Sequence, residues 1–598
     1  MSFSITPGDP QRPNIMATRH AVASGHYWAS QAGFQVLEAG GNAVDAGVAT
    51  GIALNVLESE MCSFGGVAPT MVYLAERNEV ISFSGVGPWP SGATCEYFHR
   101  HHGGTIPRGV LYSVIPAAAD IWFTALERYG TLSFGDVAGA AIRFARDGFP
   151  MYPLLREQIL DRVEAMRSMP TTAAVYLPDG RIPELGALFV QRDLGAMLQF
   201  LADEERAHKG QGRQAGIAAA RNAFYCGDIA RAIVRQQQEH GGLITAEDLA
   251  GFRAGIEKPE QIRFGDYTVY GCGPWSQGPM VLEALNLLKG FDLAAMGHNS
   301  PAYLHAVVES IKLAAADRER YFGDPDFVDV PLNVLLSDAY AATRRGAIDA
   351  ARAAPEMPMH GDVPGFARRP WRPDPSSGSV GPIPQTHILS GTKDIANIAA
   401  AAPQLETTYL CAIDRHGNAF SSTPSDSNFS SHIVPGLGIV CSTWGSRGYT
   451  DPEHPSAVGP GRRPKMSANP QLAIVPGRKV IAFGSPGNEV LGQAQIQVFL
   501  NLAVFGMDPQ SAVEQARVAS YSWPGSIVPH PYFPARLNIE SRIPRSTGEA
   551  LAALGHNIEW WPERKWLAGS PCVICHDLEL DVRFAGADHR RTAYAVGW

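Results

Sequence analysis

The threonine pair Thr407-Thr408 opens the segment that most constrains what this chain can fold into. The pair begins a predicted strand that runs to a Gly-Asn turn at Gly417 and Asn418. Alone, this pattern predicts a β-hairpin whose threonines belong to an ordinary edge strand. Its setting is unusual, because 406 residues precede it. A stretch rich in proline and glycine, residues 355–395, leads into it and is not expected to hold regular structure.

Short motifs along the chain follow the order of those in one enzyme family. They are Val22-Ala23-Ser24-Gly25-His26, Gly40-Gly41-Asn42-Ala43-Val44-Asp45-Ala46, Tyr129-Gly130-Thr131-Leu132, Ala145-Arg146-Asp147-Gly148-Phe149, Arg463-Pro464, Asn469-Pro470 and Gly484-Ser485-Pro486-Gly487. Each motif is weak alone, but their joint order is specific. The chain therefore resembles the γ-glutamyltranspeptidase (gamma-glutamyltransferase) family, a branch of the N-terminal-nucleophile (Ntn) hydrolases, over nearly its whole length.

The resemblance implies that the chain is a zymogen that cuts itself between Glu406 and Thr407. Residues 1–406 would form a large subunit, with a flexible Pro- and Gly-rich tail over residues 355–406 that withdraws after cleavage. Residues 407–598 would form the small catalytic subunit, with Thr407 as its N-terminal nucleophile.

A threonine at a new N-terminus can supply both nucleophile and base. The hydroxyl of threonine is a poor nucleophile at neutral pH and needs a base beside it. A free α-amine has a pKa of about 7.7–8.0, so the freed amine of Thr407 could take the hydroxyl proton, directly or through a water. Before cleavage the same nitrogen is an amide and cannot accept a proton.

The family fold implied for this chain is an α+β four-layer αββα sandwich built from both subunits. Gly40 and Gly41 fit a helix C-cap, and Asn42 fits the N-cap of the next helix. The expected elements are two helices in 20–60, strands at 70–73 and 80–83, mainly helices over 115–350 with a strand near 267–270, strands over 407–445, loop and strand to 485, and helices over 490–520.

Three more catalytic residues follow from the resemblance. A threonine that supports the nucleophile in the family corresponds here to Ser425. The family sequence Gly-Ser-Pro-Gly-Gly, whose paired glycines stabilise the oxyanion, reads Gly-Ser-Pro-Gly-Asn at residues 484–488. Because backbone N–H groups do this work, Gly487 and Asn488 are the predicted oxyanion donors.

The predicted substrate-binding residues depart from the family. The arginine that grips the α-carboxylate of a γ-glutamyl group is replaced by Cys95, and the aspartate that grips its α-amine is replaced by Arg447. Trp444 replaces a polar residue, and the family's serine pair has become Met466-Ser467. The predicted substrate-binding set is Arg447, Trp444, Cys95, Ser467 and Ser427.

The charge of Arg447 indicates what these changes mean for the substrate. An α-ammonium beside Arg447 would meet a like charge, and the loss of a buried charge pairing costs about 2–5 kcal/mol. We therefore expect an amidohydrolase with an acyl specificity other than γ-glutamyl. Arg447 favours an acyl group that carries a carboxylate, such as a glutaryl group, unless its side chain points to solvent. The expected partners are a small-molecule amide and a water or amine acceptor.

Two alternatives remain open. The chain is a genuine γ-glutamyl transferase or glutathione hydrolase if other residues rebuild the clamp. It is a non-catalytic binding protein if it stays unprocessed.

Composition supports an enzyme that works without nucleic acid or membrane. The net charge of −9 gives no nucleic-acid footprint, and the N-terminus lacks the basic and apolar regions of a signal peptide. No apolar run approaches a membrane span, and the eight cysteines are scattered, so we expect a cytoplasmic protein.

Neither a metal nor a cofactor is expected. Cys572-Val573-Ile574-Cys575-His576 matches the spacing of a c-type haem attachment, but the segment alternates like a strand and no export signal precedes it. The cluster of His99, His101 and His102 lacks a metal-site frame and is expected to lie in a solvated loop.

Overall fold

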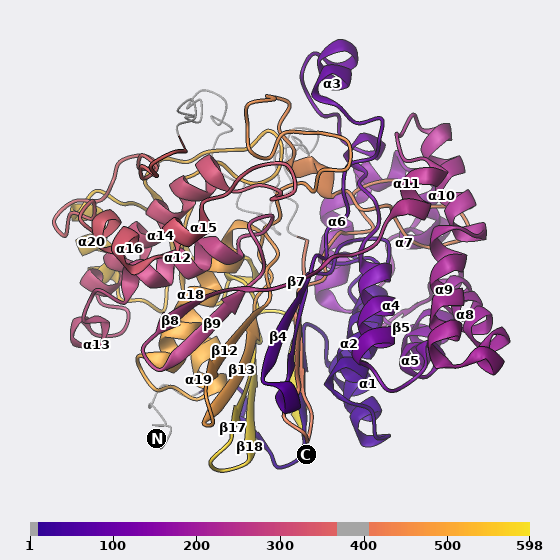
Figure 1. The fold of residues 1–598 in the computed structure, drawn as a ribbon, viewed down its shortest axis with the longest axis horizontal. Helices are drawn as coiled ribbons and strands as arrows, with labels where there is room; N and C mark the ends of the chain where they lie inside the picture. The colour runs from indigo at the N-terminus through magenta and orange to yellow at the C-terminus, as the bar shows by residue number, and fades with distance from the viewer. Residues whose placement is uncertain (1–9, 367–405) are drawn as a thin grey trace.

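The computed structural model describes residues 10–366 and 406–598. Its class is α+β, as expected: two seven-stranded sheets face each other, and helices cover both outer faces (Figure 1). Most of the predicted tail, residues 367–405, lies outside the described residues.

Both sides of the predicted cleavage site contribute strands to the first sheet. Its order is β19-β2-β10-β11-β3-β4-β7, and each pairing in it is antiparallel. The strands are β2 (Ala21–Ser24), β3 (Thr70–Leu74), β4 (Glu79–Phe83), β7 (Ile256–Glu257), β10 (Leu410–Ile413), β11 (Ala419–Ser422) and β19 (Tyr594–Gly597). The hairpin that follows Thr407 is thus inserted between β2 and β3, so the two predicted subunits share one sheet.

The second sheet has the order β1-β18-β17-β13-β12-β9-β8. Its strands are β1 (Ile15–Ala17), β8 (Glu260–Phe264), β9 (Tyr267–Gly271), β12 (Gln471–Val475), β13 (Lys479–Gly484), β17 (Cys572–Asp577) and β18 (Val582–Ala587). Smaller pairings join β5 (Phe149–Pro150) to β6 (Leu188–Phe189), and β14 (Val518–Ser520) to β15 (Arg536–Glu540) and β16 (Asn557–Trp561).

Alternation along the strands divides the core into three layers. Leu410 and Ala412 of β10 pack against helices, whereas Cys411 and Ile413 face the other sheet. This is the period of two that a strand imposes on its side chains. The predicted strand at Cys572 is confirmed as β17, and Cys572 and Cys575 lie in different core layers, which rules out one haem bonded to both.

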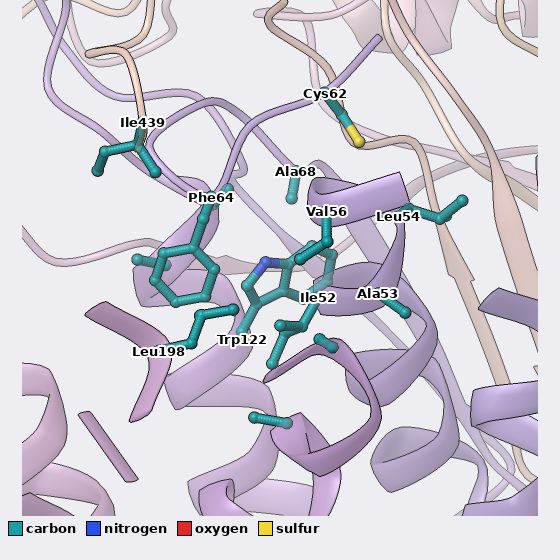
Figure 2. Packing of buried hydrophobic residues seen from close by; sticks show 14 of the residues in the cluster. Ile52, Ala53, Leu54, Val56, Cys62, Phe64, Ala68, Trp122, Leu198 and Ile439 are labelled. Carbon is teal, nitrogen blue, oxygen red and sulfur yellow. The ribbon is translucent and has the colours of Figure 1, made fainter. Parts of the chain in front are cut away.

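One helical layer covers the first sheet. It consists of α1 (Tyr27–Glu38), α2 (Ala43–Leu57), α4 (Ala118–Tyr129), α5 (Phe134–Asp147), α6 (Pro153–Arg167), α7 (Pro170–Tyr176), α8 (Arg192–Ala207), α9 (Arg213–Tyr225), α10 (Asp228–Glu239) and α11 (Ala246–Gly251). Figure 2 shows its centre, where Trp122 packs beside Ile52, and where Ile439 from beyond the predicted cleavage site joins the same cluster.

The predicted boundary between α1 and α2 is confirmed. Gly40 has φ 98°, which favours glycine, and Asn42 caps α2 in a reciprocal capping box with Asp45. All fifteen residues of α2 are buried, and the helix is apolar on every side because it lies between a sheet and other helices.

The second helical layer lies on the far side, at the left of Figure 1. It consists of α12 (Gly278–Leu288), α13 (Leu293–Met296), α14 (Pro301–Tyr321), α15 (Leu332–Leu335), α16 (Asp338–Arg345), α18 (Glu489–Ala503), α19 (Pro509–Glu514) and α20 (Arg545–Ala553). Within the described residues, none of the helices is long and apolar enough to cross a membrane.

Two expectations were wrong. Residues 423–443 form an irregular loop with short turns rather than strands, because polar side chains bond to the main chain there. The N–H of Phe429, for example, donates to Ser427. His99 and His101 are exposed and His102 is half-buried, but all three are helical, since they lie in α3 (Cys95–His102), which ends at Gly103 with φ 60°.

Candidate active site

The hairpin places Thr407 opposite Ser425. β10 and β11 pair with Leu410 opposite Ser422, and the same register continued outward brings residues 407 and 425 together. Oγ1 of Thr407 lies 2.9 Å from Oγ of Ser425, and both side chains are fully buried. Ser425 is fixed in turn by its N–H, which donates to the carbonyl of Val67 at 2.9 Å. This hydroxyl pair is the centre of the candidate site.

The main chain at Thr407 is strained. Its φ is 146°, a value that a β-branched residue rarely adopts and that costs of order 1–3 kcal/mol. The surroundings hold it there: Nη1 of Arg591 donates to the carbonyl of Thr407 at 3.0 Å, and the N–H of Thr408 donates to the carbonyl of Pro424 at 3.0 Å. The strain therefore sits at the predicted scissile bond.

Buried carboxyl groups lie near the threonine pair. Burial raises the pKa of Glu58, while hydrogen bonding by Thr408 and the charge of Arg591 oppose the shift. Burial, reinforced by the charge of Glu58, raises the pKa of Glu60 to about 8. A Cβ on Gly25 would lie 2.0 Å from Oγ1 of Thr408, so only glycine fits there.

Asp426 links Ser425 to the predicted substrate wall. It follows Ser425 directly, is fully buried and has φ 85°. Its carboxylate accepts hydrogen bonds from Oγ of Ser442 at 2.5 Å, and from the N–H and Oγ1 of Thr443 at 2.9 and 2.8 Å. Burial, with the charge of Glu406 second, raises the pKa of Asp426 to about 6.

Arg447 is buried, so the alternative in which it points to solvent is wrong. It ends the 3₁₀ turn η6 (Trp444–Arg447), and its guanidinium lies 3.4 Å from the ring centre of Trp444. Nη1 donates to Oγ of Ser446 at 3.0 Å. Only 1% of the residue is exposed, and burial lowers its pKa. A buried cation stacked on an aromatic ring is suited to bind a carboxylate.

The predicted oxyanion donors lie between β13 and α18. Gly487 has φ 135°, and Asn488, the N-cap of α18, has φ 52°. Oγ of Ser467 donates to Oδ1 of Asn488 at 3.1 Å. A Cβ on Gly484, at the end of β13, would lie 2.2 Å from the ring of Tyr409, so this loop leaves the sheet beside the start of β10.

Glu406 is buried beside Thr407, the predicted nucleophile. Only 3% of the residue is exposed, and its carboxylate accepts a hydrogen bond from Oγ of Ser430. A carboxylate inside the protein thus lies on the residue before the predicted scissile bond.

The structure does not join Cys95 or Ser427 directly to this hydroxyl pair. The thiol of Cys95, in the first turn of α3, points to the carbonyl of Val458 at 3.2 Å. Ser427 accepts from the N–H of Phe429 at 3.0 Å. Their roles in substrate binding stay predictions.

The sequence analysis missed Arg591, Glu58 and Asp426. Arg591 lies 184 residues from Thr407, and no local pattern marks it. Asp426 lies directly after the predicted Ser425, but its hydrogen-bond partners, Ser442 and Thr443, come from a later part of the chain.

A separate buried cluster joins His305, Glu309 and His556. Nζ of Lys312 already pairs with Glu309 at 2.7 Å and donates to the carbonyl of Ala354 at 2.9 Å. The ammonium of Lys312 therefore supplies the positive charge of this cluster.

The chain is similar to known proteins along nearly its full length. The family model described as Gamma-glutamyltranspeptidase matches residues 29–598. The "Glutathione hydrolase-like YwrD proenzyme" of Bacillus subtilis (strain 168) is 29% identical over 98% of this chain and 99% of its own length. The "Acylase ACY 1 proenzyme" of Pseudomonas sp. (strain SE83) is 29% identical over 90% of this chain and 87% of its own. The crystal structure of cephalosporin acylase from Bacillus halodurans superposes with a TM-score of 0.82 at 26% identity, covering 99% of this chain and 98% of the other.

Proposed function

The chain belongs to the γ-glutamyltranspeptidase family of Ntn hydrolases, and on that basis we propose that it is an autoprocessed amidohydrolase with Thr407 as its nucleophile. The observation that carries the proposal is the buried hydroxyl pair, with Oγ1 of Thr407 2.9 Å from Oγ of Ser425 at a strained main chain. Two similar proteins are named proenzymes, which supports processing.

Processing begins with attack by Oγ1 of Thr407 on the carbonyl carbon of Glu406. The C–N bond breaks, the hydroxyl proton passes to the nitrogen, and an ester joins Glu406 to Thr407. Water then hydrolyses the ester, which leaves a carboxylate on Glu406 and a free amine and hydroxyl on Thr407. The strained φ of Thr407 favours this step, because cleavage releases the constraint.

Turnover reuses the same atoms. The freed α-amine accepts the hydroxyl proton of Thr407, and the oxygen attacks the amide of the substrate. Backbone N–H groups of Gly487 and Asn488 stabilise the oxyanion, and Ser425 orients Oγ1. When the tetrahedral intermediate collapses, its C–N bond breaks, the proton held by the α-amine passes to the leaving amine, and an acyl ester remains on Thr407. A water or amine acceptor then removes the acyl group.

The acyl specificity that we propose is a carboxylate-bearing group other than γ-glutamyl. Arg447 supplies a buried cation and Trp444 a flat apolar wall. The carboxylate of Asp426, near Arg447, has the charge to pair with an α-ammonium, and this specifically favours the second candidate, a γ-glutamyl hydrolase or transferase. The similar proteins carry both kinds of name, glutathione hydrolase-like and acylase.

A panel of anilides with one leaving group tests the acyl specificity. We expect kcat/KM for glutaryl 4-nitroanilide to exceed that for the pentanoyl and γ-glutamyl anilides. Arg447→Gln should lower kcat/KM only for the carboxylate-bearing anilides. The loss should correspond to about 2–5 kcal/mol of transition-state stabilisation. A clear preference of the wild type for γ-glutamyl would establish the second candidate, and a chain that stays whole and inactive would favour a binding protein.

A further inference from the structure

Four buried charged side chains adjoin the oxyanion loop, residues 484–488. They are Arg318 and Glu319 at the end of α14, Lys465, and Glu489 at the start of α18. At most 6% of any of them is exposed. The two cations balance the two carboxylates, as buried charges require. Glu489 directly follows the predicted oxyanion donor at position 488, and α14 lies upstream of the predicted cleavage site.

The carboxylate of Glu489 has hydrogen-bond donors on both of its oxygens. Nη1 of Arg318 lies 3.2 Å from Oε2, which also accepts from the indole N–H of Trp523 at 2.8 Å. Oε1 accepts from the N–H of Ser526 at 2.9 Å and from the hydroxyl of the same residue. The first residue of α18 therefore cannot turn without breaking a charge-assisted hydrogen bond.

Arg318 also connects this loop with the predicted substrate wall. Its Nε donates to Oε1 of Glu319 at 2.9 Å, and Nζ of Lys465 donates to the same oxygen at 2.7 Å. The carbonyl of Lys465 accepts from the indole N–H of Trp444 at 3.1 Å. One arginine thus contacts two carboxylates, one beside the oxyanion loop and one that holds the segment behind Trp444.

The main chain at Asn488 needs support from its surroundings. Its φ of 52° and ψ of −115° suit glycine, the residue at this position in the family sequence Gly-Ser-Pro-Gly-Gly. Another residue keeps a strained conformation of this kind only where neighbouring contacts enforce it. Oγ of Ser467 donates to Oδ1 of Asn488 at 3.1 Å. The next residue along the chain, Glu489, is fixed by its ion pair with Arg318.

We propose that Arg318 is a positioning residue for the oxyanion site: through its ion pair with Glu489 it holds Asn488 in the conformation in which the main-chain N–H groups stabilise the oxyanion. The ion pair compensates for the glycine that Asn488 replaces. Arg318 acts through Glu489 and not on the substrate itself. This inference rests on the proposed function, because it requires the N–H groups of residues 487 and 488 to be the oxyanion donors.

Removal of the ion pair from processed enzyme is the first step of the test. Arg318→Gln and Glu489→Gln are combined, so that the buried cluster stays neutral. Both kcat and KM are measured with glutaryl and pentanoyl 4-nitroanilide. We expect kcat to fall about tenfold or more for both anilides, with KM within about twofold of wild type. The reason is that the oxyanion forms only after the acyl group has bound.

The same pair of substitutions in an Asn488→Gly background is the second step. Glycine adopts φ 52° without strain, so the pair should there lower kcat by no more than about threefold. The inference is wrong if the pair leaves kcat unchanged when Asn488 is present. It is also wrong if kcat falls by the same factor with asparagine as with glycine, because Arg318 would then not act through the conformation of residue 488.

A second buried ion pair on α14 provides the matched control. Nζ of Lys312 lies 2.7 Å from Oε1 of Glu309. Lys312→Gln combined with Glu309→Gln should lower the Tm but leave kcat within about twofold of wild type. An equal loss of kcat in this control would mark a general effect of stability and overturn the inference.

Arg318→Lys keeps the proposal testable if the neutral pair does not fold or is not processed. A lysine ammonium is a compact charge that does not reproduce the contact with both carboxylates. Its loss of kcat should again be larger with Asn488 than with glycine, and equal losses would overturn the inference.

The outcomes separate the two proposals. A wild type that is not cut before Thr407, or that is cut and inactive, overturns the proposed function. A wild type that is cut there and hydrolyses the anilides, while the ion pair has no effect that depends on residue 488, overturns only this inference.

Discussion

Oγ1 of Thr407 and Oγ of Ser425 lie 2.9 Å apart at the open end of the β10–β11 hairpin. The distance is that of a hydrogen bond between two hydroxyls. Ser425 is anchored to Val67, which lies upstream of the predicted cleavage site, so the position of the Thr407 hydroxyl depends on both sides of that site.

Removal of this partner should slow turnover without abolishing the fold. In Ser425→Ala, Oγ1 of Thr407 loses its neighbour, and kcat should fall about tenfold to a hundredfold, the range of a lost hydrogen bond to a charged or reacting group. Ser425→Thr keeps the hydroxyl and should retain most of the activity. Steady-state kinetics on processed protein checks this; a kcat for Ser425→Ala equal to that of Ser425→Thr would contradict it.

The backbone conformation of Asn488, a predicted oxyanion donor, can be tested by substitution. Asn488 has φ 52° and ψ −115°, which suits glycine better than other residues. Asn488→Gly should therefore keep kcat, since the N–H remains, whereas Asn488→Val should lower stability and activity, with a conformational cost of order 1–3 kcal/mol. Thermal unfolding and kcat of the two variants measure this. Equal tolerance of valine and glycine would show that the loop conformation is wrong.

The pH dependence of stability should report Glu60. Its pKa is raised from 4.5 to about 8 by burial and by the charge of Glu58, so the folded state favours the protonated form. The associated stability is fully present below pH 4.5 and is lost as the pH rises through about 8. Glu60→Gln stays neutral and can still accept from the hydroxyl of Tyr152.

Between pH 5 and pH 9 the free energy of unfolding of wild type should therefore fall by several kcal/mol relative to that of Glu60→Gln. Its Tm should fall with it. Glu96→Gln, at an exposed ion pair, is the control and should track wild type. Parallel curves for wild type and Glu60→Gln would mean that Glu60 is not a buried acid.

The sequence predicted those features of the site that depend on residues close together in the chain. The hairpin, its Gly-Asn turn and the caps around Asn42 depend on neighbouring residues, and the structure has them. The positive φ of Thr407 leaves no mark on composition, and the contact of Arg591 with Thr407 joins distant segments. The carboxylates whose charges act on the buried Arg447 belong to Glu406, Asp426 and Glu489, which lie far apart in the sequence. For this reason the sequence alone left open whether Arg447 is exposed.

The rate of turnover should report a base with the pKa of an amine. If the α-amine of Thr407 activates its own hydroxyl, kcat/KM should rise with pH through a pKa at or below about 8. No histidine should be essential: His26, the buried histidine that caps α1, has its pKa lowered to about 3 by burial. A pH–rate profile of wild type and His26→Asn checks this, and loss of turnover in folded His26→Asn would indicate another base.

The most direct test of the account is the state of the purified chain. Intact mass and N-terminal sequencing should find two fragments, residues 1–406 and 407–598, with a free threonine at the start of the smaller one. Thr407→Ala should remain a single inactive chain. An uncut wild type that is active, or a fragment that begins at any other residue, would contradict the assignment of Thr407 as the nucleophile.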